Sequence, residues 1–273
     1  MSENLPATMM DADALALMEQ AGATDDFGRA DLMIPSLRIL QSNSKETKRS
    51  QPEYVDGATD GMFFINVTRS LFQSVPVIPV KYQHVVREFE SGDLNAKMIA
   101  DHGTDLSVIE GLERDKKGRY LRPNSARILV DSALYYILAL TPDGAVPCAL
   151  RLGSTQWRKA RRWNTVIQNY ELKAPNGRLF RPPMYARTYT LSSRPEQNED
   201  NSWFGYHIEP GPLTLNMPDG ADLFERARVF REAADRGRTE VVGDTPEERN
   251  EHRDPADEGT ERRAPPVDDE IPF

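Results

Sequence analysis

Tryptophan and basic side chains alternate in one short segment, residues 154–164, whose sequence is STQWRKARRWN. Arginine and lysine bind the phosphates of nucleic acids, and aromatic rings stack on bases at about 1–3 kcal/mol per base. Neither contact reads the order of the bases. The composition therefore predicts a surface for single-stranded nucleic acid, with little or no sequence preference.

A helix over residues 155–170, with Ser154 as its N-cap, would sort these side chains onto two faces. At 3.6 residues per turn, one face is polar and holds Arg158, Arg161, Arg162 and Thr165. The other is apolar and holds Trp157, Ala160, Ile167 and Tyr170, with Trp163 and Val166 at its margin. The tryptophans can pack in a core or stack on bases, and the pattern leaves both interpretations open.

The basic region extends beyond this helix. Residues 151–194 contain ten basic residues and a single acid, Glu171. Tyr185, Arg187 and Tyr189 alternate, so in a strand they would share one face and could form a stacking surface. The residues predicted to bind single-stranded DNA are Trp157, Arg158, Lys159, Arg161, Arg162, Trp163, Arg178, Arg181, Tyr185, Arg187, Tyr189 and Trp203.

The charge of the whole chain points the other way. Its 273 residues include 34 basic and 43 acidic side chains, a net charge of -9 that by itself argues against a polyanionic partner. That charge is unevenly distributed, with -6 on residues 1–31, +5 on 32–238 and -8 on 239–273. We therefore expect an acidic, partly helical N-terminal segment (1–31), a binding core (32–238) and a disordered acidic tail (239–273).

Runs rich in β-branched and aromatic residues predict a β-rich core. The expected strands are 62–67, 75–80 continued by 82–89, 127–140, 145–152, and a hairpin of 184–191 with 203–208 across a polar loop, 192–202. Pro76 and Pro79 indicate an edge or bulged strand, because proline donates no ladder hydrogen bond. With helices at 155–170 and 221–236, this pattern favours a β or α+β fold: an OB-like small barrel with one or two helices.

The last six residues form an acidic run that ends in an aromatic side chain: Asp268, Asp269, Glu270, Ile271, Pro272 and Phe273. Such an end suits a small apolar pocket rimmed by arginine or lysine on a partner protein. It resembles the acidic tip of bacterial single-stranded-DNA-binding proteins, which ends in the same Asp-Asp-x-Ile-Pro-Phe pattern. The resemblance implies docking to replication, recombination or repair proteins. The preceding linker differs, being charged rather than Gly/Gln-rich.

The core resembles phage-encoded single-stranded-DNA-binding proteins in four blocks. They are residues 34–41 (IPSLRILQ), 61–64 (GMFF), 77–82 (VIPVKY) and 154–164. This resemblance implies a non-enzymatic protein that coats and protects single-stranded DNA during phage DNA replication, recombination or repair. It leaves the oligomeric state open.

Two other functions stay open at this point. Glu171 and Lys173 match the Glu-x-Lys part of a metal-dependent nuclease site, with Asp131 and Asp143 as candidate metal-binding carboxylates by position alone. The other alternative is an adaptor that acts through its tail without binding DNA. We expect no catalytic residue, metal ion or cofactor, because the chain has no Gly-Lys-Ser/Thr phosphate loop and only one cysteine, Cys148, in an apolar run.

No apolar run approaches the ~18 residues of a membrane span, and the N-terminus lacks the pattern of a secretory signal. We therefore expect no membrane partner and a cytoplasmic location, which is the host cytoplasm for a phage-encoded protein.

Overall fold

The computed structural model describes residues 33–92, 96–115, 118–198, 201–236 and 240–241. Contacts divide the chain into two units, Met1–Leu32 and Met33–Phe273, and all described residues belong to the second. The predicted N-terminal segment and the tip 268–273 lie outside the described residues, as does all of the predicted tail except 240–241. Those two residues form strand β14 (Glu240–Val241), which pairs in parallel with β1 (Met33–Ile34).

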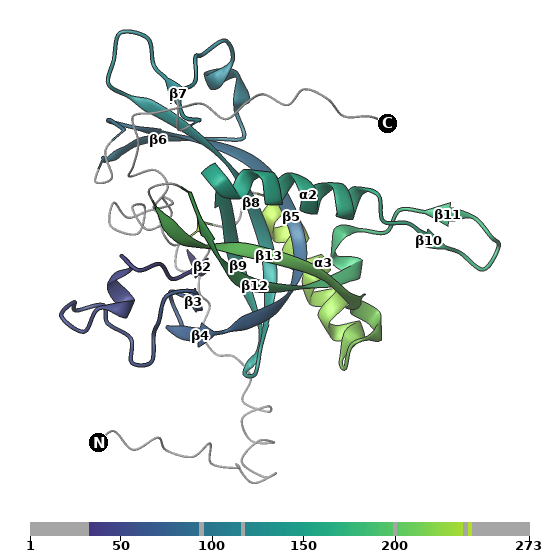
Figure 1. Cartoon of the computed structure of the whole chain (residues 1–273). Helices are drawn as coiled ribbons and strands as arrows, with labels where there is room; N and C mark the ends of the chain where they lie inside the picture. Colours follow the sequence, from purple (N-terminus) through teal and green to yellow (C-terminus); the bar gives the residue numbers. More distant parts are fainter. Residues whose placement is uncertain (1–32, 93–95, 116–117, 199–200, 237–239, 242–273) are drawn as a thin grey trace. The chain divides into compact units, whose positions relative to one another are not determined.

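Three long antiparallel strands form the centre of the fold (Figure 1). They are β5 (Ser74–Phe89), β8 (Ile128–Thr141) and β9 (Gly144–Gly153). A tight turn joins β8 to β9, in which the Thr141 hydroxyl donates to the Gly144 carbonyl and Gly144 adopts φ 120°. Only glycine takes this backbone conformation without strain, which explains the turn signal in the sequence.

The main sheet has ten strands in the order β13-β12-β5-β8-β9-β2-β3-β4, with β6 beside β5 and β7 beside β8. The other strands of this sheet are β2 (Ser36–Ile39), β3 (Phe63–Ile65), β4 (Ser70–Phe72), β6 (Met98–Gly103), β7 (Tyr120–Leu121), β12 (Arg187–Gln197) and β13 (Ser202–Leu213). A separate hairpin pairs β10 (Leu172–Lys173) with β11 (Leu179–Phe180). The described residues form two α-helices, α2 (Trp157–Gln168) and α3 (Gly220–Asp235), and short 3-10 helices η2 (Lys45–Thr47), η3 (Leu106–Ile109), η4 (Ser154–Gln156), η5 (Met184–Ala186) and η6 (Thr214–Asn216).

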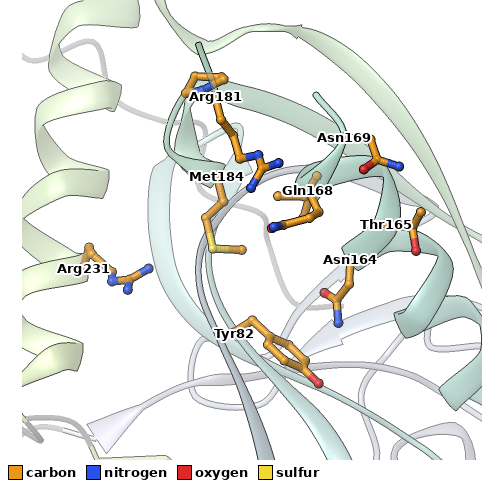
Figure 2. A pocket seen from close by; sticks show the side chains of 10 residues that line it. Tyr82, Asn164, Thr165, Gln168, Asn169, Arg181, Met184 and Arg231 are labelled. Atoms are coloured by element: carbon orange, nitrogen blue, oxygen red, sulfur yellow. The ribbon is translucent and has the colours of Figure 1, made fainter. Parts of the chain in front are cut away.

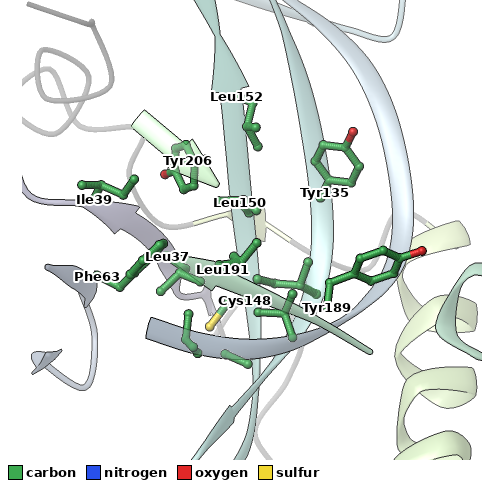
Figure 3. Packing of buried hydrophobic residues seen from close by; sticks show 14 of the residues in the cluster. Leu37, Ile39, Phe63, Tyr135, Cys148, Leu150, Leu152, Tyr189, Leu191 and Tyr206 are labelled. Atoms are coloured by element: carbon green, nitrogen blue, oxygen red, sulfur yellow. The ribbon is translucent and has the colours of Figure 1, made fainter. Parts of the chain in front are cut away.

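The sheet curls around a core into which α2 inserts its apolar face. Because side chains alternate along a strand, β8 sends Tyr135 and Ile137 into this core and Tyr136 and Leu138 to the opposite side. Figure 3 shows side chains from several strands meeting inside the curl. On the opposite side, α3 covers the sheet with residues that include Phe230, whose ring meets Tyr136 edge-on at 6.1 Å. A sheet covered on both faces accounts for the almost unbroken apolar run of β8.

One side chain joins β13 to the chain that follows β2. The Gln41 amide donates to the Phe204 carbonyl at 2.9 Å and accepts from the Phe204 amide at 2.9 Å. The Gln41 side chain thus forms with the Phe204 backbone the pair of hydrogen bonds that a neighbouring strand would form. Nearby, the Ser193 hydroxyl donates to the Gly61 carbonyl, and a Cβ on Gly61 would lie 2.8 Å from the Phe204 ring. These contacts hold the curl closed where no strand ladder does so among the described residues.

Replacing Gln41 by leucine is therefore expected to lower the free energy of unfolding by about 2–3 kcal/mol. Gln41 is buried, and its loss leaves the N–H and C=O of Phe204 without partners. Urea denaturation followed by circular dichroism measures the change. The matched control is Gln73→Leu at an exposed position, which should change the unfolding free energy by less than about 0.5 kcal/mol. Equal losses in the two variants would contradict the closing role of Gln41.

The expected fold class is confirmed: the protein is β-rich, with a curled half-barrel sheet and two α-helices among the described residues. The strand with Pro76 and Pro79 is bulged, with a register shift between Pro79 and Lys81, and it continues to Phe89 as expected. The hairpin of β12 and β13 is also confirmed. The predicted loop 192–202 is wrong in extent, because strand pairing continues to Gln197↔Ser202.

Two local predictions are wrong. Ser154 does not cap the helix: it has φ 44° and begins η4, and α2 follows with Gln156 at the N-cap position and no side-chain cap bond. Tyr185 does not share a strand face with Arg187 and Tyr189. It lies in η5, before β12 begins. Both errors arise where single-turn helices, which carry little periodic signal, separate longer elements.

Candidate nucleic-acid interface

The first residue of α2 is fixed to the sheet by a buried carboxylate. Asp131, on β8, accepts a hydrogen bond from Trp157 Nε1 at 3.0 Å and lies 3.1 Å from His84 Nε2. The His84 and Trp157 rings meet edge-on, with centroids 4.8 Å apart. Because Asp131 is only 5% exposed, these two ring partners and the Arg114 guanidinium, 3.6 Å away, offset its desolvation. This contact sets where the helix starts.

The inner face of α2 is anchored by aromatic packing. Trp163 is 3% exposed and stacks on Tyr135, with ring centroids 4.4 Å apart and planes 30° from parallel. It also meets Tyr189 edge-on at 5.4 Å. The Tyr135 hydroxyl donates to Asn164 Oδ1 at 2.7 Å, and burial raises the pKa of this phenol, so it remains a donor at neutral pH. The helix therefore cannot rotate about its axis without breaking the core.

This orientation directs the guanidinium groups of Arg158, Arg161 and Arg162 outward. All three are exposed, and within the described part of the chain none is paired with an acid. Arg161 lies over the Trp157 ring at 5.8 Å, a cation–π contact that leaves its N–H groups available. We call these three residues the α2 basic face.

The arginines of α3 differ in that acids neutralise them. Arg228 pairs with Glu225 and Glu232, Arg231 pairs with Asp235, and Arg236 at the C-cap pairs with Glu232, each acid being three or four residues away. Such pairs are typical of a solvated helix surface. The contrast shows that the positive charge of α2 is not a general property of the surface helices.

The other predicted basic residues divide into two groups. Arg178 and Arg181 are exposed, in the turn of the β10–β11 hairpin and just after it. Lys159 is paired with Glu196 on β12, and Arg187 donates to the Gly211 carbonyl and lies over the Tyr170 ring at 4.7 Å. The structure thus gives Lys159 and Arg187 internal partners and leaves Arg178 and Arg181 on the surface.

Most of the predicted aromatic residues belong to the core. Trp163, Tyr189 and Trp203 are buried, and Trp203 Nε1 donates to Glu196 at 3.0 Å. Trp157 and Tyr185 are half-buried; Tyr185 packs against Phe224 on α3 with centroids 4.9 Å apart. The sequence left open whether Trp157 and Trp163 pack in the core: Trp163 does, and Trp157 is half-buried.

A groove of about 650 Å³ lies beside the second half of α2, and Figure 2 shows the side chains that line it. Its volume lies within the ~300–1,000 Å³ of small-molecule sites. Thr165 lies between the α2 basic face and the groove, since its hydroxyl donates to the Arg161 carbonyl one turn earlier and its side chain lines the groove. The groove is lined by Tyr82, Asn164, Thr165, Ile167, Gln168, Asn169, Arg181, Pro182, Met184 and Arg231.

The groove combines apolar walls with hydrogen-bonding groups. Figure 2 shows Arg181, Gln168 and Met184 directed into it from three segments of the chain: the stretch after β11, α2 and η5. Burial raises the pKa of the Tyr82 phenol, so its hydroxyl is protonated at neutral pH. Arg231 is partly neutralised by Asp235, whereas Arg181 has no acidic partner in the described ranges. Sequence reasoning missed the groove, although Asn164 and Gln168 are spaced i, i+4 and so share one edge of α2.

The residues of the nuclease alternative are far apart. Asp131 contacts the first residue of α2, and Glu171 follows the end of that helix, so its twelve residues, about 18 Å of rise, lie between them. Asp143 is exposed in the β8–β9 turn. Within the described ranges, no group of three or more His, Cys, Asp or Glu side chains could hold a metal ion.

The described residues define a β-rich protein whose curled sheet carries a helix with an unpaired basic face beside a groove. Residues 4–240 match the family model of the Pam3 phage gp34-like protein, and the chain belongs to this family of phage proteins. No curated protein and no solved structure matches it. Neither α2 nor α3, the α-helices of the described ranges, is long and apolar enough to cross a membrane.

Proposed function

We propose that this protein binds single-stranded DNA with little sequence preference and protects it during phage DNA replication, recombination or repair. The binding surface is the α2 basic face, continued by Arg181 and Arg178. Phosphates of the strand pair with the guanidinium groups, which supplies affinity without reading bases. The protein acts without a cofactor in the host cytoplasm.

The observation that carries this proposal is the pairing state of the arginines. Arg158, Arg161 and Arg162 lie within two turns of one helix that contains no acidic residue. Placing like charges this close is unfavourable for the isolated helix, since like-charge neighbours on a helix repel each other. A polyanion that neutralises them explains why the sequence keeps them together, whereas α3 balances its arginines internally.

A salt titration tests the function. Binding of a fluorescein-labelled oligo(dT) to the full chain, followed by anisotropy, should weaken steeply as salt rises. With five phosphate contacts (the α2 basic face, Arg181 and Arg178), the slope of log K against log salt should be about -3.5, at about 0.7 per phosphate for single strands. Absence of binding at low salt, or binding independent of salt, would refute the proposal. Mg²⁺-dependent cleavage of the same strand would favour the nuclease alternative.

The acidic tip supplies the second part of the proposal, recruitment of replication, recombination or repair proteins. The support is its resemblance to the bacterial tip, carried by residues such as Ile271 and Phe273. Deleting Phe273 alone should abolish docking to such partners and leave affinity for oligo(dT) unchanged. A chain that docks partners but never binds DNA would instead be the adaptor described above.

A further inference from the structure

The burial of Trp163, Tyr189 and Trp203 raises a question about the bases of a bound strand. A strand held by phosphate contacts alone would turn its bases to solvent, but the groove beside the α2 basic face offers them a site. Thr165 connects the two surfaces directly. A strand whose phosphates lie along Arg158, Arg161 and Arg162 therefore passes the edge of the groove.

We propose that the groove takes one nucleotide of the bound strand, with its base inside and its phosphate at Arg181. This inference rests on the proposed function and assigns a place to a base. Part of the groove wall suits the flat face of a base. Met184 and Ile167 are apolar and pack against the main core cluster, so they present a firm surface to one flat face of a base.

Hydrogen-bonding groups surround this apolar surface. Gln168 and Asn169 are exposed at the end of α2. Neither side-chain amide forms a hydrogen bond with a described residue, so both are available to the edge of a base. An amide presents both donors and acceptors and can rotate to offer either. It therefore accepts any base, which agrees with a protein that binds without sequence preference.

The charges of the groove place the phosphate. Arg231 is held by Asp235 at 2.8 Å and by the Val80 carbonyl at 3.2 Å, so its guanidinium is largely satisfied. Arg181 lacks such partners among the described residues, and its side chain is directed into the groove (Figure 2). Arg161 lies close to the groove as well, because its carbonyl accepts from Thr165 and its charge acts on the Tyr82 phenol, both of which line the groove. A nucleotide with its base inside would therefore have Arg181 at its phosphate and Arg161 near the adjoining part of its backbone.

The test compares two strands of equal length and charge, oligo(dT) and an oligomer of abasic deoxyribose phosphates, each titrated with the full chain. If the groove holds a base, oligo(dT) binds about 10-fold more tightly or better, the gain expected from burying one base against side chains. Equal affinities within twofold would overturn the inference while leaving the proposed function intact. Failure of both strands to bind would refute both.

Two variants assign the difference to the groove. Gln168→Ala keeps a good helix former at an exposed position and should lower the ratio of the two affinities about threefold, the effect of one lost hydrogen bond. Arg181→Gln should weaken both strands equally, about fivefold at 0.1 M salt, because it removes a phosphate contact. The control Gln73→Ala, at an exposed glutamine between β4 and β5, should change neither quantity. A ratio unchanged by Gln168→Ala, or affinities unchanged by Arg181→Gln, would contradict the assignment.

Discussion

Replacing Arg158, Arg161 and Arg162 together by glutamine is expected to weaken binding of oligo(dT) about 100-fold at 0.1 M salt. Each phosphate contact to a single strand contributes about 0.7 to the slope of log K against log salt. Removing three contacts makes the slope shallower by about 2. Since the phosphate contribution vanishes at about 1 M salt, the variant binds about 100-fold more weakly than the parent at about 0.1 M, one decade lower in salt. Anisotropy titrations at several salt concentrations measure both quantities.

The fold should tolerate this triple change. The three side chains are exposed, and none forms an ion pair with another described residue, so urea denaturation should give an unfolding free energy within about 1 kcal/mol of the parent protein. The matched control removes the same charge elsewhere, at exposed Lys48, Arg49 and Lys97. If that control loses as much affinity as the α2 variant, net charge rather than the α2 basic face governs binding.

Replacing Trp163 by alanine is expected to lower the free energy of unfolding by about 3–5 kcal/mol, a large part of the stability of an ordinary domain. The indole is 3% exposed and lies between Tyr135 and Tyr189, where its loss leaves a cavity in the core inside the curled sheet. Chemical denaturation measures the change.

The phenylalanine variant of Trp163 separates a core role from a stacking role. Trp163 Nε1 is buried and has no hydrogen-bond partner in the described part of the protein, so a smaller ring sacrifices no hydrogen bond. We expect Trp163→Phe to lose less stability than Trp163→Ala and to bind oligo(dT) within twofold of the parent. A folded Trp163→Phe protein with strongly reduced DNA affinity would show that the indole meets bases after all.

The long strands could be predicted from the types of residue they contain. The apolar run of β8, the turn at Gly144 and the return strand β9 were all readable, because burial on both faces and a left-handed turn leave clear signatures in the residues. Short elements were not. η4 and η5 each span three residues and shifted the expected positions of Ser154 and Tyr185.

The candidate site was predictable in part, for a similar reason. Helical periodicity separates Arg158, Arg161 and Arg162 from the apolar side of α2, and the structure places all three on the exposed side. Periodicity cannot tell which neighbouring residues neutralise a charge. Lys159 and Arg187 looked equivalent to these arginines until the fold brought Glu196 and Gly211 against them.

The sequence by itself determined a β-rich chain, its two described α-helices, and the concentration of positive charge between residues 151 and 194, because these depend on local composition and period. Only the tertiary structure decided that Trp163 and Trp203 are core residues and that Gln41 closes the curl. It also decided that Tyr82, Gln168 and Met184, from distant parts of the chain, meet in one groove. Such contacts depend on which segments pack together across long sequence separations, and no local pattern records that information.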